Sequence, residues 1–160
     1  MVKKVKYLGN IRTYVDTSVY GGVFDEDFKE DSLRFFELVK KKYFKLVISS
    51  VVSLEVSGAN RKVQDFFSNL LIDAELVEVN EESIRLREQY INAGIVNKQS
   101  LVDALHVATA SIARVPLVIS WNFKHIVNFK KIPLYNAVNI ANGYPNIGIY
   151  SPKEVIEIDE

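Results

Sequence analysis

A chain of 160 residues has the size of one domain, about 100–200 residues, and can bury a hydrophobic core without cross-links. Apolar residues make up 48% of the chain and charged residues 25%, which excludes both a disordered polymer and a fibrous repeat. With 20 basic and 20 acidic residues the net charge is zero, so only local patches, and not the whole chain, can attract nucleic acid.

The histidine and cysteine content limits the metals that the chain can hold. The sequence has no cysteine, so neither a disulfide framework nor a thiolate zinc site can form. Only His106 and His125 could serve as imidazole ligands. Any bound metal must therefore be held mainly by oxygen atoms.

The sequence has no feature of a membrane protein. Residues 1–6 are basic, but no apolar run of about 7–15 residues follows them, as it would in a secretory signal. No stretch of roughly 18 apolar residues occurs anywhere. We expect a cytoplasmic protein that does not bind a membrane.

Strands and helices alternate in the first half of the chain. A short run rich in threonine, tyrosine and valine predicts a strand that ends at Asp16, before a pair of glycines. The helix that follows has Asp31 or Ser32 as its predicted N-cap. The next strand carries consecutive apolar residues, which suits burial on both faces of a parallel sheet. The predicted elements are a strand over residues 12–16, a helix over 32–42, a strand over 45–49 and a short helix that opens at Ser49 and Ser50 and contains Glu55.

The second half of the chain continues this alternation. Apolar residues at helical spacing predict three longer helices, and the last of these is so rich in leucine, valine and alanine that it should lie centrally against the sheet. Gly94 stands where the end of a helix is expected to have glycine. The predicted elements are helices over residues 60–71, 82–93 and 101–113, strands over 76–79, 117–120 and 146–150, and a short final helix.

This order of elements predicts the fold class. Strands that alternate with helices form a largely parallel sheet that is covered by helices on both faces. We therefore expect an α/β fold, a three-layer α/β/α sandwich with a mainly parallel central sheet, in one domain over residues 1–160. The ligand site of such a fold lies beyond the carboxyl ends of the strands.

Four polar residues fall where that site is expected. Asp16 closes the first strand, Glu55 follows the second, Asp103 lies in the first turn of the central helix, and Asn122 follows a later strand. Three carboxylates in one cleft repel each other unless a divalent cation neutralises them. Oxygen ligands without thiolates or paired histidines favour Mg²⁺ or Mn²⁺ over zinc. One or two such ions can hold a scissile phosphate, generate the attacking hydroxide and stabilise the leaving oxygen, so the predicted reaction is phosphodiester hydrolysis.

The three acids also have structural interpretations. Asp16 could cap the turn that follows its strand. Ser100 and Asp103 have the spacing of a capping box, in which the acid bonds back to the cap residue. Glu55 lies among valines and a leucine, where an unpaired carboxylate would be costly to bury, so it must reach solvent, a base or a metal.

The histidines, lysines and tryptophan have structural alternatives as well. We expect His106 to be a core histidine with satisfied hydrogen bonds, and His125 to be a surface residue. The lysine run over residues 40–42 is expected to be solvated surface. Trp121 could fill the core or stack on a base. A second basic group fits a solvated surface and a binding patch equally well: Lys124, His125, Lys130 and Lys131.

Four segments carry motifs in a recognisable order. They are Tyr14-Val15-Asp16-Thr17-Ser18, Ser53-Leu54-Glu55-Val56, Asp103-Ala104-Leu105-His106-Val107-Ala108-Thr109-Ala110 and Leu117-Val118-Ile119-Ser120-Trp121-Asn122. With them the chain resembles the PIN-domain family from end to end, and residues 147–154 look like its closing strand and turn. The segment that begins at Asp103 is the most specific match, whereas Glu55 is placed by order and spacing.

The resemblance implies an activity, partners and residue roles. PIN domains are Mg²⁺- or Mn²⁺-dependent ribonucleases, often the toxin of a toxin–antitoxin pair and commonly dimeric. We therefore expect an endoribonuclease with an RNA substrate, an antitoxin partner and a homodimer. The resemblance makes Asp16 and Asp103 direct metal ligands, and Glu55 a direct or water-mediated ligand that helps to orient the attacking water. Asn122 becomes an outer ligand, at or near a position where the family usually has a fourth acid. Because an amide adds no charge, we expect weaker metal affinity, or one ion where other members hold two.

Two other functions would use the same residues. The first is a catalytically weak or silent PIN-fold module that binds RNA or a protein partner, and the amide of Asn122 motivates it. The second is a phosphatase of small phosphoesters, which needs an enclosed pocket instead of an open groove. The expected homodimer depends on an apolar patch that the pairs Phe35-Phe36 and Phe66-Phe67 would leave once the core is filled.

Overall fold

The central feature of the structure is one parallel sheet. The computed structural model describes residues 9–157. The sheet has five strands in the order β3-β2-β1-β4-β5, and every neighbouring pair is parallel. The strands are β1 (Ile11–Val15), β2 (Phe44–Ser49), β3 (Glu75–Val77), β4 (Leu117–Ile119) and β5 (Gly148–Tyr150).

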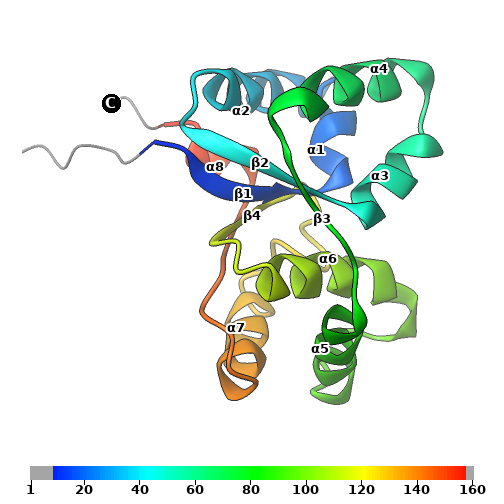
Figure 1. Ribbon diagram of the computed structural model, residues 1–160, viewed down its shortest axis with the longest axis vertical. Helices are drawn as coiled ribbons and strands as arrows, with labels where there is room; N and C mark the ends of the chain where they lie inside the picture. Colours follow the sequence, from blue (N-terminus) through cyan, green and yellow to red (C-terminus); the bar gives the residue numbers. More distant parts are fainter. Residues whose placement is uncertain (1–8, 158–160) are drawn as a thin grey trace, which may run out of the picture.

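Helices cover both faces of this sheet and give the molecule three layers (Figure 1). α1 to α4 lie on one face, α5 to α7 lie on the other, and α8 packs against α2. The α/β/α sandwich expected from the sequence is confirmed. The helices are α1 (Thr17–Gly22), α2 (Lys29–Lys40), α3 (Ser50–Ser57), α4 (Arg61–Leu70), α5 (Glu81–Asn92), α6 (Leu101–Ile112), α7 (Ile132–Ala141) and α8 (Pro152–Val155), with short 3₁₀ turns η1 (Leu71–Asp73) and η2 (Lys98–Ser100).

Burial explains why the apolar segments take these places. In β2 every residue except Lys45 is buried, as the consecutive apolar residues predict for an inner parallel strand. In α6 seven residues are buried, because this helix lies between the sheet and α5. The core therefore extends on both sides of the sheet, and the polar residues of β1, β4 and α6 are held in fixed positions.

The order of the strands in the sheet changes direction at β1, so the carboxyl ends of β1 and β4 form the expected place for a ligand. After β1 the chain adds β2 and β3 on one side, and it then adds β4 and β5 on the other. The backbone N–H of Asp16 donates to the carbonyl of Ile119 at 2.9 Å, so the first residue after β1 stays joined to the end of β4. Open α/β sheets bind ligands at such a switch point, beyond the carboxyl ends of the strands.

Two helices were not predicted from the sequence. α1 has two glycines and two β-branched residues among its six, which lowers its intrinsic helix propensity. α7 begins with Pro133 in its first turn, where proline is tolerated because the missing N–H would have no helical partner. Both helices are stabilised by packing, since α1 contacts α2, α3 and α4, and α7 contacts α5.

The predicted N-cap of α2 was wrong. The helix begins one turn earlier, with Phe28 as N-cap, so Asp31 lies in its first turn. The hydroxyl of Ser32, which is fully buried, accepts a hydrogen bond from Nε1 of Trp121 at 2.9 Å instead of capping the helix. Gly94 follows α5 with a φ of +75°, the left-handed conformation predicted for this position.

The phenylalanines that were expected to leave a surface patch belong to the core. Phe35, Phe36 and Phe67 are at most 5% exposed, and Phe66 packs its ring edge-on against Phe36. Among residues 9–157 no helix has the length and apolar character needed to cross a bilayer. The organisation of residues 1–160 as one domain stays a prediction.

Candidate metal centre

Asp16 lies directly after β1, with a buried carboxylate that two hydroxyl groups hold in place. Its Oδ2 atom accepts hydrogen bonds from Ser18 Oγ at 2.7 Å and from Ser120 Oγ at 2.8 Å. The residue is only 5% exposed. Although Asp16 occupies the N-cap position of α1, its side chain makes no capping hydrogen bond. The capping interpretation is therefore wrong, and the carboxylate is directed to the end of the sheet.

The same two serines connect Asp16 to the end of β4. Ser18 Oγ accepts the backbone N–H of Trp121 at 3.0 Å, and Ser120 Oγ accepts that of Asn122 at 2.9 Å. Each hydroxyl thus donates to Asp16 and accepts from the chain that leaves β4. This network fixes the position of the carboxylate relative to both strands of the switch point.

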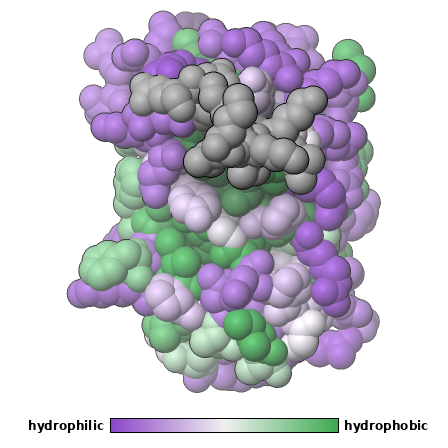
Figure 2. All heavy atoms as spheres, turned by 90° about the vertical axis from the view of Figure 1, so that its left-hand side faces the viewer, coloured by the Kyte–Doolittle hydropathy of each residue, from purple (hydrophilic) through white to green (hydrophobic). Residues whose placement is uncertain are grey.

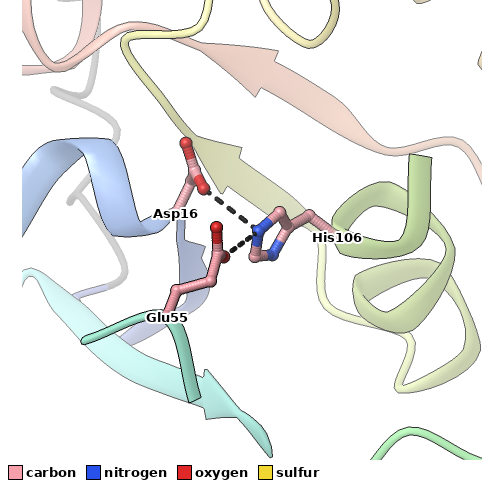
Figure 3. A group of neighbouring side chains, drawn as sticks. All are labelled: Asp16, Glu55 and His106. Carbon is pink, nitrogen blue, oxygen red and sulfur yellow. Dashed lines mark hydrogen bonds and ion pairs between the residues drawn. The ribbon is translucent and has the colours of Figure 1, made fainter. Parts of the chain in front are cut away.

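Glu55 on α3 lies beside the carboxylate of Asp16, and the ring of His106 faces both acids (Figure 3). His106 Nε2 is 2.6 Å from Glu55 Oε1 and 3.3 Å from Asp16 Oδ1. Oε1 of Glu55 also accepts a hydrogen bond from Thr17 Oγ1 at 2.9 Å. One ligand atom from each of Asp16, Glu55 and His106 lies within 4.8 Å of the other two. Glu55 thus reaches a base, which is one of the three outcomes that its apolar neighbours required.

His106 is only 1% exposed, and its second nitrogen is bonded as well. Its Nδ1 atom is 2.6 Å from the hydroxyl of Tyr14, which is itself 2.7 Å from Ser49 Oγ. With a neutral ring, Ser49 donates to Tyr14, Tyr14 donates to Nδ1, and the Nε2–H group donates to Glu55. The expectation of a core histidine with satisfied hydrogen bonds is confirmed, but its partners are the candidate acids.

Asp103 is half-buried in the first turn of α6, and Asn122 is its neighbour. Burial raises the pKa of Asp103, the hydrogen bond from the Asn122 amide and the charge of His125 oppose this, and the negative charge of Asp16 adds to it. Ser100 makes no side-chain cap bond, so the predicted capping box is absent from α6. Asp103 is therefore left to interact with Asn122 and with the charges of the cluster.

The acids and the histidine of the cluster shift each other's pKa. Burial acts against ionised Glu55, but the hydrogen bond and charge of His106 and the hydroxyl of Thr17 together lower the pKa of Glu55. Burial likewise acts against a charged His106, yet the hydrogen bond to Glu55 and the charges of Asp16, Glu55 and Asp103 raise its pKa. The site thus favours an ionised Glu55 beside a positively charged His106.

Sequence reasoning missed the polar residues that hold the acids in place. Ser18 and Ser120 bond to Asp16, and Thr17 and His106 bond to Glu55. One signal was available for His106, because it lies three residues after Asp103 and so on the same face of α6. The serines gave no comparable signal, since a hydroxyl at a strand end occurs in many turns.

The donor groups of this cluster fit a divalent cation. Carboxylate oxygens are the ligands that Mg²⁺ and Mn²⁺ prefer, and Asp16 keeps its Oδ1 atom directed at the other donors. The buried carboxylate of Asp16 is paired with His106, whose Nε2 atom lies 3.3 Å from Oδ1. A cation among the acids would add a second positive charge beside this carboxylate. Two cavities of about 440 Å³ lie elsewhere, one at the amino end of β2 and one beside α3 and β3, and none of the three acids lines either.

Solved structures share this fold over most of both chains. A chain of VapBC2 from Rickettsia felis, solved with a DNA fragment from its promoter, has a TM-score of 0.57 and 16% identity, covering 88% of this chain and 98% of that one. FitAcB from Neisseria gonorrhoeae has a TM-score of 0.57 and 12% identity, and the match covers 89% of this chain and 99% of that one. FitAB bound to an IR36 DNA fragment has a TM-score of 0.56 and 10% identity, and the match covers 92% of this chain and 98% of that one. No protein-family model and no curated protein matches the sequence. At these identities the likeness shows the fold.

Proposed function

We propose that this chain, which has the PIN-domain fold, is a Mg²⁺- or Mn²⁺-dependent endoribonuclease and the toxin of a toxin–antitoxin pair. The observation that carries the proposal is the arrangement of Asp16 and Glu55 at the carboxyl end of a parallel sheet, with Asp103 within electrostatic reach. Such a group of acids costs stability unless positive charge neutralises it, and a divalent cation would add to the charge that His106 supplies to Asp16 and Glu55. The proposal places the protein in the cytoplasm, together with its RNA substrate.

Each acid has a distinct part in this proposal. When bound, the metal ion would supply an activated water and stabilise charge on the phosphate oxygens. Asp16 and Asp103 would hold the ion directly. Glu55, which has a side chain that is 38% exposed, would hold it directly or through the water that it orients. Asn122 would be an outer ligand, because its oxygen already accepts the His125 N–H at 3.0 Å.

His106 is a positioning residue in the proposed mechanism. Its Nε2–H group donates to Glu55, so the ring sets the direction of that carboxylate. Tyr14 and Ser49 in turn hold the ring from the other side. Residues that orient a metal ligand in this way commonly change metal affinity about 10–100-fold when they are replaced.

A silent binding module is the competing function, and Asn122 is the residue that favours it. The amide donates to Asp103 and adds no charge, which weakens the attraction for a cation. The phosphatase alternative would use the same acids, but a small phosphoester needs an enclosing pocket around them.

A homodimer is the second part of the partner proposal. The face at the left of Figure 1 carries apolar surface on its lower half, where α7 lies (Figures 1 and 2). On α7 the side chains of Leu134 and Ile140 are 48% and 59% exposed. Light scattering of purified protein should give the mass of a dimer, and the double variant Leu134→Glu, Ile140→Glu should shift it to a monomer. A wild-type monomer at high concentration would remove this proposal.

The antitoxin is the third partner. We expect the product of the adjacent gene to co-purify with this chain when both are expressed together, and to suppress its ribonuclease activity. Separate elution of the two proteins, with unchanged activity, would contradict a toxin–antitoxin pair.

The experiment that tests the ribonuclease uses a mixed RNA pool. We expect cleavage by the purified chain with Mn²⁺ or Mg²⁺, no cleavage with chelator, and loss of about 100-fold or more in rate for Asp16→Asn. Asp27→Asn, which changes an exposed aspartate between α1 and α2, is the matched control and should cleave normally. A well-folded wild-type chain that cleaves no RNA under any of these conditions would favour the silent module.

A further inference from the structure

Two successive turns after β4 share a tripeptide sequence and an asparagine side chain that accepts the backbone N–H three residues further on. Asn-Phe-Lys occurs at residues 122–124 and again at 128–130. In the first turn Asn122 Oδ1 accepts the backbone N–H of His125 at 3.0 Å. In the second, Asn128 Oδ1 accepts the backbone N–H of Lys130 at 3.0 Å and of Lys131 at 3.3 Å. Side-chain caps of this kind fix a turn, so each turn presents its phenylalanine and lysine in a defined way.

The two phenylalanines are exposed. Phe123 is 51% exposed and Phe129 is 81% exposed. Phenylalanine is usually buried, and exposed apolar groups on adjoining turns mark a binding surface more often than isolated ones do. Other phenylalanines of this chain, such as Phe35 and Phe36, are buried in the core, so Phe123 and Phe129 differ from them in their exposure.

The turns are anchored, so the rings are presented on a rigid support. Trp121 stacks on Phe28 with ring centroids 4.4 Å apart, and Phe123 contacts the edge of Trp121 at 6.0 Å. Between the turns Ile126 is fully buried. The hydroxyl of Tyr135 on α7 donates to the carbonyl of His125 at 2.8 Å. A surface that is fixed before binding loses little conformational entropy when it binds.

This surface is positively charged and begins at the acid cluster. Residues 121–132 include three lysines and no acidic residue, in a chain whose net charge is zero. Lys124 and Lys130 are exposed, and Lys131 Nζ is 3.2 Å from His125 Nδ1. Asn122, the first residue of the first turn, donates a hydrogen bond to Asp103. The charged aromatic segment is therefore continuous with the candidate metal centre.

We infer that the aromatic–lysine surface, made of Phe123, Lys124, Phe129 and Lys130, binds single-stranded RNA next to the scissile phosphodiester. The phenylalanine rings stack on unpaired bases, and the lysines contact the phosphates between them. This inference rests on the proposed function and adds to it the surface that holds the RNA strand beside the cleavage position.

The chemistry of the surface distinguishes a single strand from a duplex. Every base of a single strand has a free face on which an aromatic ring can stack, whereas bases in a duplex are stacked on each other. Lysines alone would attract both forms through their phosphates. The exposed rings are thus the part of the surface that selects unpaired bases.

The test measures binding without cleavage. A short single-stranded RNA of mixed sequence that contains 2-aminopurine is titrated with the full chain in chelator, and both anisotropy and 2-aminopurine fluorescence are recorded. We expect quenching on binding, and about tenfold weaker binding with reduced quenching for Phe123→Leu and for Phe129→Leu. Lys124→Gln and Lys130→Gln should each reduce the dependence of binding on salt, by about 0.7 in the logarithmic slope.

Matched controls separate this surface from general effects. Phe24→Leu changes a phenylalanine that is 43% exposed and packs edge-on against Phe66 of α4, and Lys40→Gln changes the last residue of α2, so both should bind normally. Because Phe129 is 81% exposed, its leucine variant should keep the stability of the wild-type chain.

Several outcomes would overturn the inference. They are a wild-type chain that binds no RNA, equal affinity for a duplex of the same sequence, and leucine variants that bind and quench as the wild type does. Failure of the proposed function has a different signature. If the chain binds this RNA through the two rings but cleaves none with Mn²⁺, the binding surface stands and the proposed nuclease activity is wrong. If the chain is an active nuclease and its leucine variants bind as the wild type does, the nuclease activity stands and the binding surface is wrong.

Discussion

His106 Nε2 lies 2.6 Å from Glu55 Oε1, so a histidine of α6 holds a carboxylate of α3 across the end of the sheet. The two residues are 51 positions apart in sequence, and Asp16, which directly follows β1, contacts the same ring. The acidic cluster is therefore held together by contacts that connect three elements. Its geometry depends on the buried hydroxyl groups that support the ring and the acids.

The hydroxyl of Tyr14 supports the ring of His106, and Tyr14→Phe should destabilise the protein. The variant leaves Nδ1 of a buried histidine without its partner, which typically costs about 1–3 kcal/mol. Urea unfolding measures this loss. The matched control is Tyr20→Phe, because the buried hydroxyl of Tyr20 has no hydrogen-bond partner among residues 9–157 and its removal should be neutral or stabilising. Equal losses in both variants would mean that the Tyr14 hydrogen bond adds nothing.

The hydroxyl of Ser120 should control metal affinity through Asp16. Ser120→Ala removes a donor to Asp16 Oδ2 and the acceptor of the Asn122 N–H group. We expect about 10–100-fold weaker Mn²⁺ binding by calorimetry, because the ligand loses its fixed orientation. Ser53→Ala, an exposed change on α3, should bind the ion normally. Unchanged affinity in Ser120→Ala would separate this serine from the metal centre.

Gly22 should tolerate no side chain. A Cβ atom there would lie 2.7 Å from Ser32 Oγ and 2.9 Å from Trp121 Nε1, the two atoms of one hydrogen bond. Overpacking of this kind costs about 1–3 kcal/mol, so Gly22→Ala should lower the free energy of unfolding by that amount. The added Cβ of Gly21→Ala would meet no atom within 4 Å in the part of the chain that the structure describes, so this variant should be neutral or slightly stabilising. Similar unfolding curves for the two variants would argue against this packing.

The fold could be predicted because its evidence lies in local patterns. The consecutive apolar residues of β2 and the apolar α6 specify buried elements, and alternation of strands and helices specifies a parallel sheet. α7 was missed because its ten residues are stabilised by packing and carry two asparagines, which are poor helix formers. The same limit applies to α1, with its two glycines.

The candidate site could be predicted only in part. Asp16 and Glu55 were selected because they follow β1 and β2, and the structure brings both of them to His106. The metal-binding roles of Asp16, Glu55 and Asp103 stay predictions. The partners of these acids were not predicted, because Ser18, Ser120 and Thr17 become neighbours of the carboxylates only through the sheet register and the start of α1. Tertiary contacts of this kind leave no periodicity in the sequence. Exposure of Phe129 is likewise a property of the folded turn.

The ion pair between Arg12 and Glu75 should stabilise the protein in a pH-dependent way. The hydrogen bond from Arg12 lowers the pKa of Glu75 below its ordinary value of 4.5, and burial opposes this effect. A folded-state pKa below the unfolded value contributes stability above the unfolded pKa, and this stability is lost as the pH falls through the folded pKa. Glu75→Gln should therefore be less stable than wild type at neutral pH, by roughly 1 kcal/mol or less, and the difference should vanish in acid.

Urea unfolding of both proteins as a function of pH measures that difference. Glu81→Gln is the control, because Glu81 is almost fully exposed and its nearest Arg85 nitrogen lies at 3.9 Å. A difference between wild type and Glu75→Gln that stays constant from neutral to acidic pH would show that the charge of Glu75 is not its source.

A direct titration of Mn²⁺ by electron paramagnetic resonance is the measurement that tests the central claim, namely that Asp16, Glu55 and Asp103 together hold a divalent cation. The wild-type chain, Asp16→Asn, Glu55→Gln, Asp103→Asn and the exposed control Asp27→Asn are compared as folded proteins. We predict saturable binding by the wild type and by the control, with affinity about tenfold or more weaker in each of the three site variants. Equal Mn²⁺ binding by all five proteins, or none by the wild type, would contradict the metal centre.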